Sequence, residues 1–208
     1  MDRTAALLVV DMQYLDAHAD YGMGRRALDR GISLDYYLAR LRTIVPNVRR
    51  LQDASRANGM QVIHTRIMSM THDGRDRSPE HKALDIHAAP GSKEAEFLPE
   101  IAPVGDEIVF SKTAGGVFNS TNIHYVLRNL GVRTLIVCGV STAGCVEGAV
   151  RAARDIGYDV IVIEDACGAW TREMHDAAIH VMREVFAKIK STDELIASLP
   201  RAAVVSAP

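Results

Sequence analysis

The chain has 208 residues, of which 48% are apolar and 24% charged, and its formal net charge at pH 7 is −2. This length suits one α/β domain with a substantial core. The near-neutral charge gives no basic surface for nucleic acid, and no apolar run is long enough for a membrane span. We therefore expect neither nucleic acid nor a membrane as a partner.

Apolar runs rich in β-branched residues predict six buried strands, at residues 5–11, 60–65, 106–112, 133–140, 158–166 and, more weakly, 187–191. Amphipathic stretches predict helices between them, at residues 34–59, 121–131, 143–157 and 172–186. Pro46 should kink the first helix or split it in two. This alternation predicts an α/β fold with a parallel sheet and helices on both faces.

Two polar stretches, residues 14–33 and 67–105, interrupt the alternation. Both contain glycine and are rich in histidine, aspartate and arginine. Long loops of this kind often cover a substrate, but they can equally be surface decoration. The sequence leaves these alternatives open.

Reactive side chains follow three of the predicted strands. Asp11 ends the first strand, Lys112 ends the third, and Cys145 follows the fourth where a helix begins. Singly, each has a structural explanation: a helix cap, a solvated lysine, a buried cysteine. Because ligands of parallel sheets bind beyond the carboxyl ends of the strands, their placement at one edge favours a reactive site.

The chemistry of these three residues fits nucleophilic catalysis. Thiolate is the reactive form of cysteine, and a nearby cation and a helix N-terminus should lower the pKa of Cys145. Asp11 can take the thiol proton and return it to a leaving amine, while Lys112 keeps the carboxylate charged. Backbone N–H groups near Cys145 can face the oxygen of a tetrahedral intermediate.

Three motifs resemble the isochorismatase-like cysteine hydrolases. They are "ALLVVDMQ", "FSKTAGGVF" and "GVSTAGCVEGAVRAARDIGYDVIVIEDAC", in the order found in that superfamily, and the resemblance covers residues 5–195. The superfamily includes nicotinamidases, N-carbamoylsarcosine amidase, and biuret and ureidoacrylate hydrolases. The resemblance implies a single hydrolase domain over residues 1–208, with a three-layer Rossmann-like fold and a six-stranded parallel sheet in the order 3-2-1-4-5-6.

The resemblance also implies the roles of individual residues. Asp11, Lys112 and Cys145 would form the catalytic triad. A non-proline cis peptide between Val140 and Ser141 would turn the Ser141 amide toward the substrate, so that the Ser141 and Cys145 amides form an oxyanion hole.

Four further residues are predicted to bind substrate. Gln13, Phe118 and Thr142 match family positions, whereas Arg66 is chosen because it follows the second strand and could hold a carboxylate or ureido carbonyl. Each has an alternative: a helix N-cap for Thr142, a packed core ring for Phe118 and a solvated loop residue for Arg66.

The sequence has no recognisable metal-binding segment. Nicotinamidases carry an Asp-Trp-His-like metal segment after the second strand, where this chain has "HTRIMSMTHDGRD". The spacing of His64, His72, His81 and His87 matches no metal pattern. We therefore expect no metal and no organic cofactor, and do not expect nicotinamide as substrate.

Together these features predict a cysteine-dependent amidohydrolase that cleaves a C–N bond of a small amide, carbamoyl or ureido compound through an acyl-enzyme. Alternatives are a vinyl-ether hydrolase of isochorismate type and a catalytically silent binding module. The odd number of cysteines, without a C-x-x-C pair, favours the reducing cytoplasm over a disulfide framework. The resemblance implies a homodimer or homotetramer.

Overall fold

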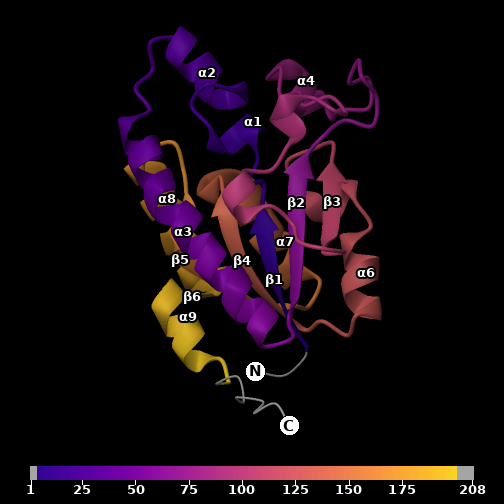
Figure 1. The fold of residues 1–208 in the computed structure, drawn as a ribbon, viewed down its shortest axis with the longest axis vertical. Helices are drawn as coiled ribbons and strands as arrows, with labels where there is room; N and C mark the ends of the chain where they lie inside the picture. The colour runs from indigo at the N-terminus through magenta and orange to yellow at the C-terminus, as the bar shows by residue number, and fades with distance from the viewer. Residues whose placement is uncertain (1–3, 201–208) are drawn as a thin grey trace.

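A computed structural model describes residues 4–200 and contains one six-stranded sheet (Figure 1). The strands are β1 (Ala5–Val10), β2 (Gln61–Ile67), β3 (Ile108–Lys112), β4 (Thr134–Val140), β5 (Asp159–Gly168) and β6 (Lys188–Lys190). Their order is β3-β2-β1-β4-β5-β6, and every neighbouring pair is parallel. The predicted fold class and strand order are confirmed.

Burial follows position in the sheet. All six residues of β1 are buried, and in β4 only the first residue is not. Central strands of a parallel sheet are covered on both faces, which is why these runs are apolar at nearly every position. The edge strand β6 has three residues, two of them lysines, so its sequence pattern was weak.

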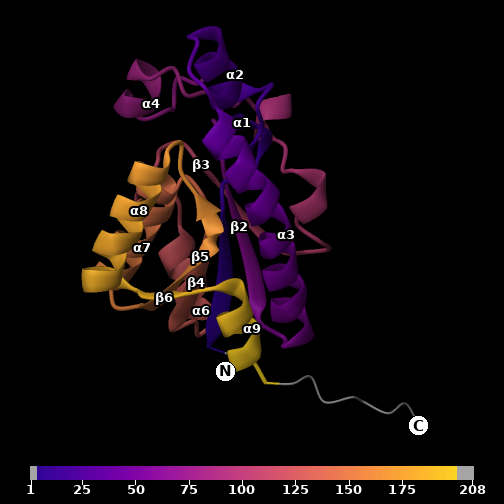
Figure 2. The ribbon, with the colours of Figure 1, turned by 90° about the vertical axis from the view of Figure 1, so that its left-hand side faces the viewer.

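Helices form a layer on each face of the sheet (Figure 2). One face is covered by α3 (Asp35–Ala57) and α9 (Thr192–Ser198), and the other by α6 (Ile123–Asn129), α7 (Glu147–Asp155) and α8 (Arg172–Val181). No helix in residues 4–200 has the length and apolar character needed to cross a membrane.

The helix α3 continues through Pro46 and is not split in two. Proline removes one backbone hydrogen bond from a helix, which leaves the carbonyl four residues earlier without its partner. That carbonyl belongs to Arg42, and both Arg42 and Pro46 are exposed, so water can replace the missing donor.

The two polar stretches contain short helices rather than unstructured loops. They include α1 (Tyr14–Ala17), α2 (Gly22–Asp29) and α4 (Pro79–Ala83), with short 3₁₀ turns at Lys93–Ala95 and Pro99–Ile101. In Figure 1, α1, α2 and α4 lie above the carboxyl ends of the central strands. The stretches therefore cover the sheet edge where the reactive side chains were predicted.

Candidate active site

Asp11, Lys112 and Cys145 meet at the carboxyl ends of the strands. The Lys112 Nζ lies 2.8 Å from Asp11 Oδ2 and 3.2 Å from Cys145 Sγ, and it also donates to the Ala114 carbonyl at 3.1 Å. Asp11 and Lys112 are fully buried, and Cys145 is partly buried. The lysine thus joins the carboxylate to the thiol.

A neighbouring strand orients Asp11. The Thr65 hydroxyl donates to Asp11 Oδ1 at 2.7 Å, and the Asp11 amide donates to the Thr65 carbonyl at 3.1 Å. Asp11 has a left-handed backbone conformation, with φ of 52°, directly after β1 ends. Oδ1 is therefore held by a hydrogen bond from β2, and Oδ2 by the ion pair with Lys112 of β3.

The turn that carries Cys145 begins at a close contact between β4 and β1. Gly139 has φ of 116°, and a Cβ there would lie 2.1 Å from the Val10 carbonyl oxygen, so only glycine fits. The Val140–Ser141 peptide is cis, at the position where the family resemblance places it. A π-helical turn over Thr142–Val146 follows, and α7 begins after it.

The protonation of the thiol differs from the prediction. Burial raises the pKa of Cys145 above its ordinary value, Asp11 adds to the rise, and Lys112 offsets only part of it. Burial alone would lower the pKa of Lys112, but the charges of Asp11 and Cys145 outweigh it and raise that pKa. The expected lowering of the Cys145 pKa was wrong, because the shift runs in the opposite direction.

Gln13 holds a covering segment in place. Its Nε2 donates to the carbonyls of Ile67 (2.9 Å) and Glu94 (2.8 Å), and its Oε1 accepts from the Ile67 amide at 2.5 Å. The side chain is fully buried, and both amide N–H groups are used by backbone. The geometry supports a positioning role for Gln13, and its contact with substrate stays a prediction.

Arg66 lies on the sheet face opposite the triad. Successive side chains of a strand point to opposite faces, and Thr65 faces Asp11. Arg66 instead donates to Ser111 Oγ at 3.0 Å and the Ala95 carbonyl at 3.1 Å, and burial lowers its pKa. The structure therefore does not bring Arg66 to the triad.

Phe118 packs partly buried against the main core, with its ring centroid 6.1 Å from that of Tyr158. This contact matches the alternative of a core ring. Among the described residues, no contact joins Phe118 to the triad, and its role in the pocket stays a prediction.

Thr142 is fully buried and belongs to a series of hydrogen bonds between side chains. Its Oγ1 lies 2.9 Å from His175 Nδ1, and Arg40 Nη2 lies 3.2 Å from His175 Nε2. A guanidinium can only donate, so His175 Nε2 accepts and its Nδ1–H donates to Thr142. Thr142 thus fixes the turn before Cys145 against α8.

Several residues near the triad were missed by sequence analysis, namely Asp16, Thr65, His81 and His175. Two of them, Asp16 and His81, come from the covering segments, which gave no pattern to interpret. Thr65 could have been found only by knowing that it pairs with Val10 at the end of the sheet. That register is a long-range property absent from the local sequence.

Other cysteines and histidines have contacts of their own away from Asp11, Lys112 and Cys145. Cys138 and Cys167 are fully buried in the main core, and burial raises the pKa of Cys167 to about 12. His64 contacts Glu107, and His87 contacts Ser69. Within residues 4–200, no three His, Cys, Asp or Glu side chains gather in a way that could hold a metal ion.

A doubly covered parallel sheet with an aspartate, lysine and cysteine in contact at its carboxyl edge defines a cysteine hydrolase fold and site. The model of the isochorismatase domain matches residues 5–194, and the chain belongs to the isochorismatase family.

Three relatives illustrate the range of this family. Ureidoacrylate amidohydrolase RutB of Acinetobacter baylyi is 27% identical, over 92% of this chain and 82% of that protein. A probable inactive nicotinamidase of Arabidopsis thaliana is 31% identical, over 92% of this chain and 94% of that protein. The crystal structure of N-carbamoylsarcosine amidase from Thermoplasma acidophilum superposes with a TM-score of 0.71 at 26% identity, covering 91% of this chain and 97% of that one.

Proposed function

We propose that this protein is a cysteine-dependent amidohydrolase that cleaves a C–N bond of a small amide, carbamoyl or ureido compound. The observation that carries the proposal is the contact of Lys112 with both Asp11 and Cys145, at 2.8 and 3.2 Å. It places a base, a cation and a nucleophile within one buried cluster. The relatives named as amidases and amidohydrolases support the same reaction class.

The first half of the proposed reaction forms a thioester. Asp11 accepts the thiol proton as Cys145 Sγ attacks the substrate carbonyl carbon, which suits a thiol whose pKa is raised by burial. The carbonyl oxygen becomes an oxyanion, for which we assign the Ser141 and Cys145 amides as donors. When the intermediate collapses, the C–N bond breaks, and the proton passes from Asp11 to the leaving nitrogen.

The second half restores the enzyme. A water molecule gives a proton to Asp11 and attacks the thioester carbonyl carbon. Collapse of this second intermediate breaks the C–S bond, and the thiolate recovers the proton from Asp11. The product is a carboxylic or carbamic acid. Throughout, the Lys112 ammonium lies close to the negative charge as it passes between Asp11, the oxyanion and, on breakage of the C–S bond, the Cys145 thiolate.

Location and assembly belong to the same proposal. A catalytic thiol keeps its activity in a reducing compartment, so we propose a cytoplasmic enzyme. A homodimer or homotetramer is proposed from the family resemblance, and light scattering of the purified protein tests it.

The decisive experiment measures ammonia release from a panel of biuret, N-carbamoyl amino acids, ureidoacrylate, nicotinamide and maleamate. We expect turnover of at least one amide or ureido compound, and loss of about 1,000-fold or more of it in Cys145→Ala. Cys167→Ala is the matched control, because its thiol lies in the main core. A covalent mass increase on Cys145 during turnover should accompany hydrolysis.

Other outcomes separate the alternatives. Full activity of Cys145→Ala would contradict the covalent mechanism. Turnover of a vinyl ether that is insensitive to iodoacetamide would favour the isochorismate-type reaction. Silence on the whole panel, with no mass change on Cys145, would favour a binding module.

A further inference from the structure

Two side chains from the covering segments bring unpartnered polar atoms to the triad. His81 lies on α4 and Asp16 on α1, and each has a buried atom without a hydrogen-bond partner among the described residues: His81 Nδ1 and Asp16 Oδ2. Buried polar atoms are nearly always paired in a folded protein. Gln52, Ser55, His64 and Ser92 also carry such atoms, so it is the attachment of Asp16 and His81 to the segments around the triad, and not the missing partner alone, that points to a ligand.

The placement of His81 follows from the attachment of α4. The amide of Ser78, which caps α4, donates to the carbonyl of Thr113 at 2.9 Å, one residue after Lys112. Beyond α4, the Ile86 amide donates to the His81 carbonyl at 2.8 Å, and Ile86 packs against the apolar cluster that also contacts Cys145. His81 is 2% exposed, so its ring is enclosed by the protein.

Asp16 reaches the triad from the other segment. Its neighbour Leu15 belongs to the same apolar cluster that contacts Cys145. The charges of Asp11 and Lys112 act on the Asp16 carboxyl, and burial, followed by the Asp11 charge, raises the pKa of Asp16 to about 7. Asp11 and Lys112 also act on His81, whose pKa is lowered mainly by burial. The two orphans thus share the electrostatic environment of the triad.

The two covering segments are tied to each other. Arg26 of α2 donates to the carbonyls of Leu84 and Asp85 and lies 3.6 Å from the Asp85 carboxylate. This contact holds the first segment against the second.

We propose that Asp16 and His81 are substrate-contact residues that accept hydrogen bonds from N–H groups of the substrate and disfavour a carboxylate at that end. The inference rests on the proposed function and narrows its substrate class to compounds whose reacting end is uncharged and carries N–H donors, such as a primary amide or urea group. A carboxylate would face the Asp16 carboxyl and the Nδ1 lone pair that we assign to a neutral His81, and neither favours an anion.

The test uses two alkylating reagents of matched size, so that it does not depend on hydrolysis. Iodoacetamide carries an uncharged N–H donor group, and iodoacetate carries a carboxylate in its place. In both, Cys145 Sγ forms a bond to the methylene carbon, iodide leaves, and the thiol proton is lost to base. Rates at pH 8 are measured by mass spectrometry of the Cys145 peptide and divided by those of glutathione.

The wild-type protein should prefer iodoacetamide beyond the preference of glutathione, and Asp16→Asn and His81→Gln should each reduce this preference about 10-fold. Asp20→Asn and His72→Gln are matched controls at exposed positions and should leave it unchanged. Thermal unfolding identifies any variant that fails to fold, and Asp16→Asn, which keeps the side-chain shape, then decides alone.

The outcomes separate this inference from the proposed function. A preference that stays within twofold of wild type in Asp16→Asn would overturn the inference, even if ammonia release is observed. A preference that falls while the panel yields no ammonia would support the contact residues and contradict amide hydrolysis. If a panel compound is hydrolysed, Asp16→Asn should raise its KM more than it lowers kcat.

Discussion

The base of the triad is oriented through both of its oxygen atoms. Asp11 Oδ2 faces the Lys112 ammonium of β3, and Oδ1 accepts from the Thr65 hydroxyl of β2. A carboxylate held at both oxygens has little rotational freedom, so in the proposed mechanism the proton from Cys145 would reach a fixed position. Precision of this kind contributes directly to rate, because small displacements of a catalytic group are costly.

Thr65→Val tests this orientation. Valine keeps the shape of threonine but removes the donor to Asp11, and a hydrogen bond to a charged group contributes about 1.5–3 kcal/mol. We expect kcat/KM for the panel substrate to fall about 10-fold or more. Thr65→Ser keeps the hydroxyl and should stay within a few-fold of wild type. A loss in Thr65→Ser with none in Thr65→Val would show that the methyl packing, and not the hydroxyl, matters.

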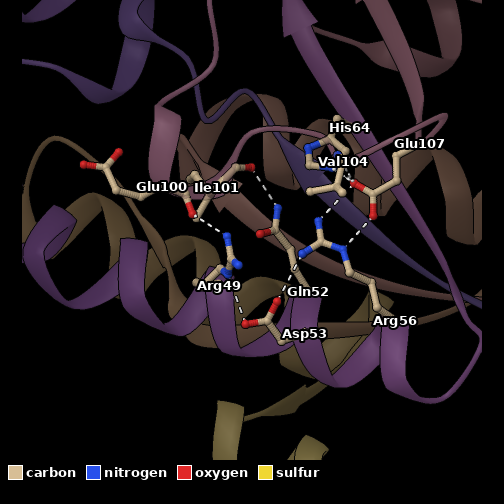
Figure 3. Close-up of polar contacts among 9 residues, drawn as sticks. All are labelled: Arg49, Gln52, Asp53, Arg56, His64, Glu100, Ile101, Val104 and Glu107. Atoms are coloured by element: carbon tan, nitrogen blue, oxygen red, sulfur yellow. Dashed lines mark hydrogen bonds and ion pairs between the residues drawn. The ribbon is translucent and has the colours of Figure 1, made fainter.

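At the scale of elements, α3 fixes the segment that leads into β3 (Figure 3). The Arg56 guanidinium contacts both carboxylate oxygens of Glu107 at 2.8 and 3.0 Å, and Glu107 Oε2 also accepts from the Val104 amide and contacts His64 of β2. Nearer the N-terminus of α3, Gln52 donates to the Ile101 carbonyl. These contacts hold the residues that precede β3. They thereby help to position Lys112, the last residue of that strand.

Glu107→Gln tests the contribution of this cluster to stability. Burial alone would raise the pKa of Glu107, but hydrogen bonds from Arg56, Val104 and His64 hold it below its ordinary value, so the carboxylate is charged at neutral pH. Replacing it should lower the free energy of unfolding by about 1–2 kcal/mol and Tm by roughly 2–8 °C. Glu100→Gln, at an exposed position in the same segment, is the control. An unchanged Tm in Glu107→Gln would contradict a structural role.

At the scale of the molecule, local pattern predicted the strands and the reactive residues at their carboxyl ends, whereas the strand order and the triad roles came from the family resemblance. Apolar β-branched runs locate the strands, and parallel strands bring Asp11, Lys112 and the turn before Cys145 to one edge. The direction of the Cys145 pKa shift and the orientation of Arg66 could not be predicted, because they depend on burial and on strand register. The contacts of the covering segments likewise join residues far apart in the chain.

The acid stability of the whole molecule should depend on His175. Burial, followed by the charges of Arg40 and Arg172, lowers the pKa of His175 from 6.5 to about 4, and only Asp176 opposes this shift. Between these pH values the unfolded chain binds a proton that the folded chain does not. The contribution of His175 to the free energy of unfolding is therefore fully present above pH 6.5. About 3 kcal/mol of it is lost as the pH falls to 4.

His175→Asn removes this dependence. At pH 7 the variant should be less stable than wild type, because Thr142 and Arg40 lose their partner. As the pH is lowered to 4 the gap should narrow by about 3 kcal/mol, because only the wild type must keep a buried imidazole neutral against protonation. Chemical denaturation at pH 7, 5 and 4 measures the gap, with His180→Asn as the control at an exposed position of the same helix. A gap that stays constant across this range would show that His175 titrates alike in the folded and unfolded chains, and that the ordered contact from Arg40 through His175 to Thr142 does not depend on a neutral ring.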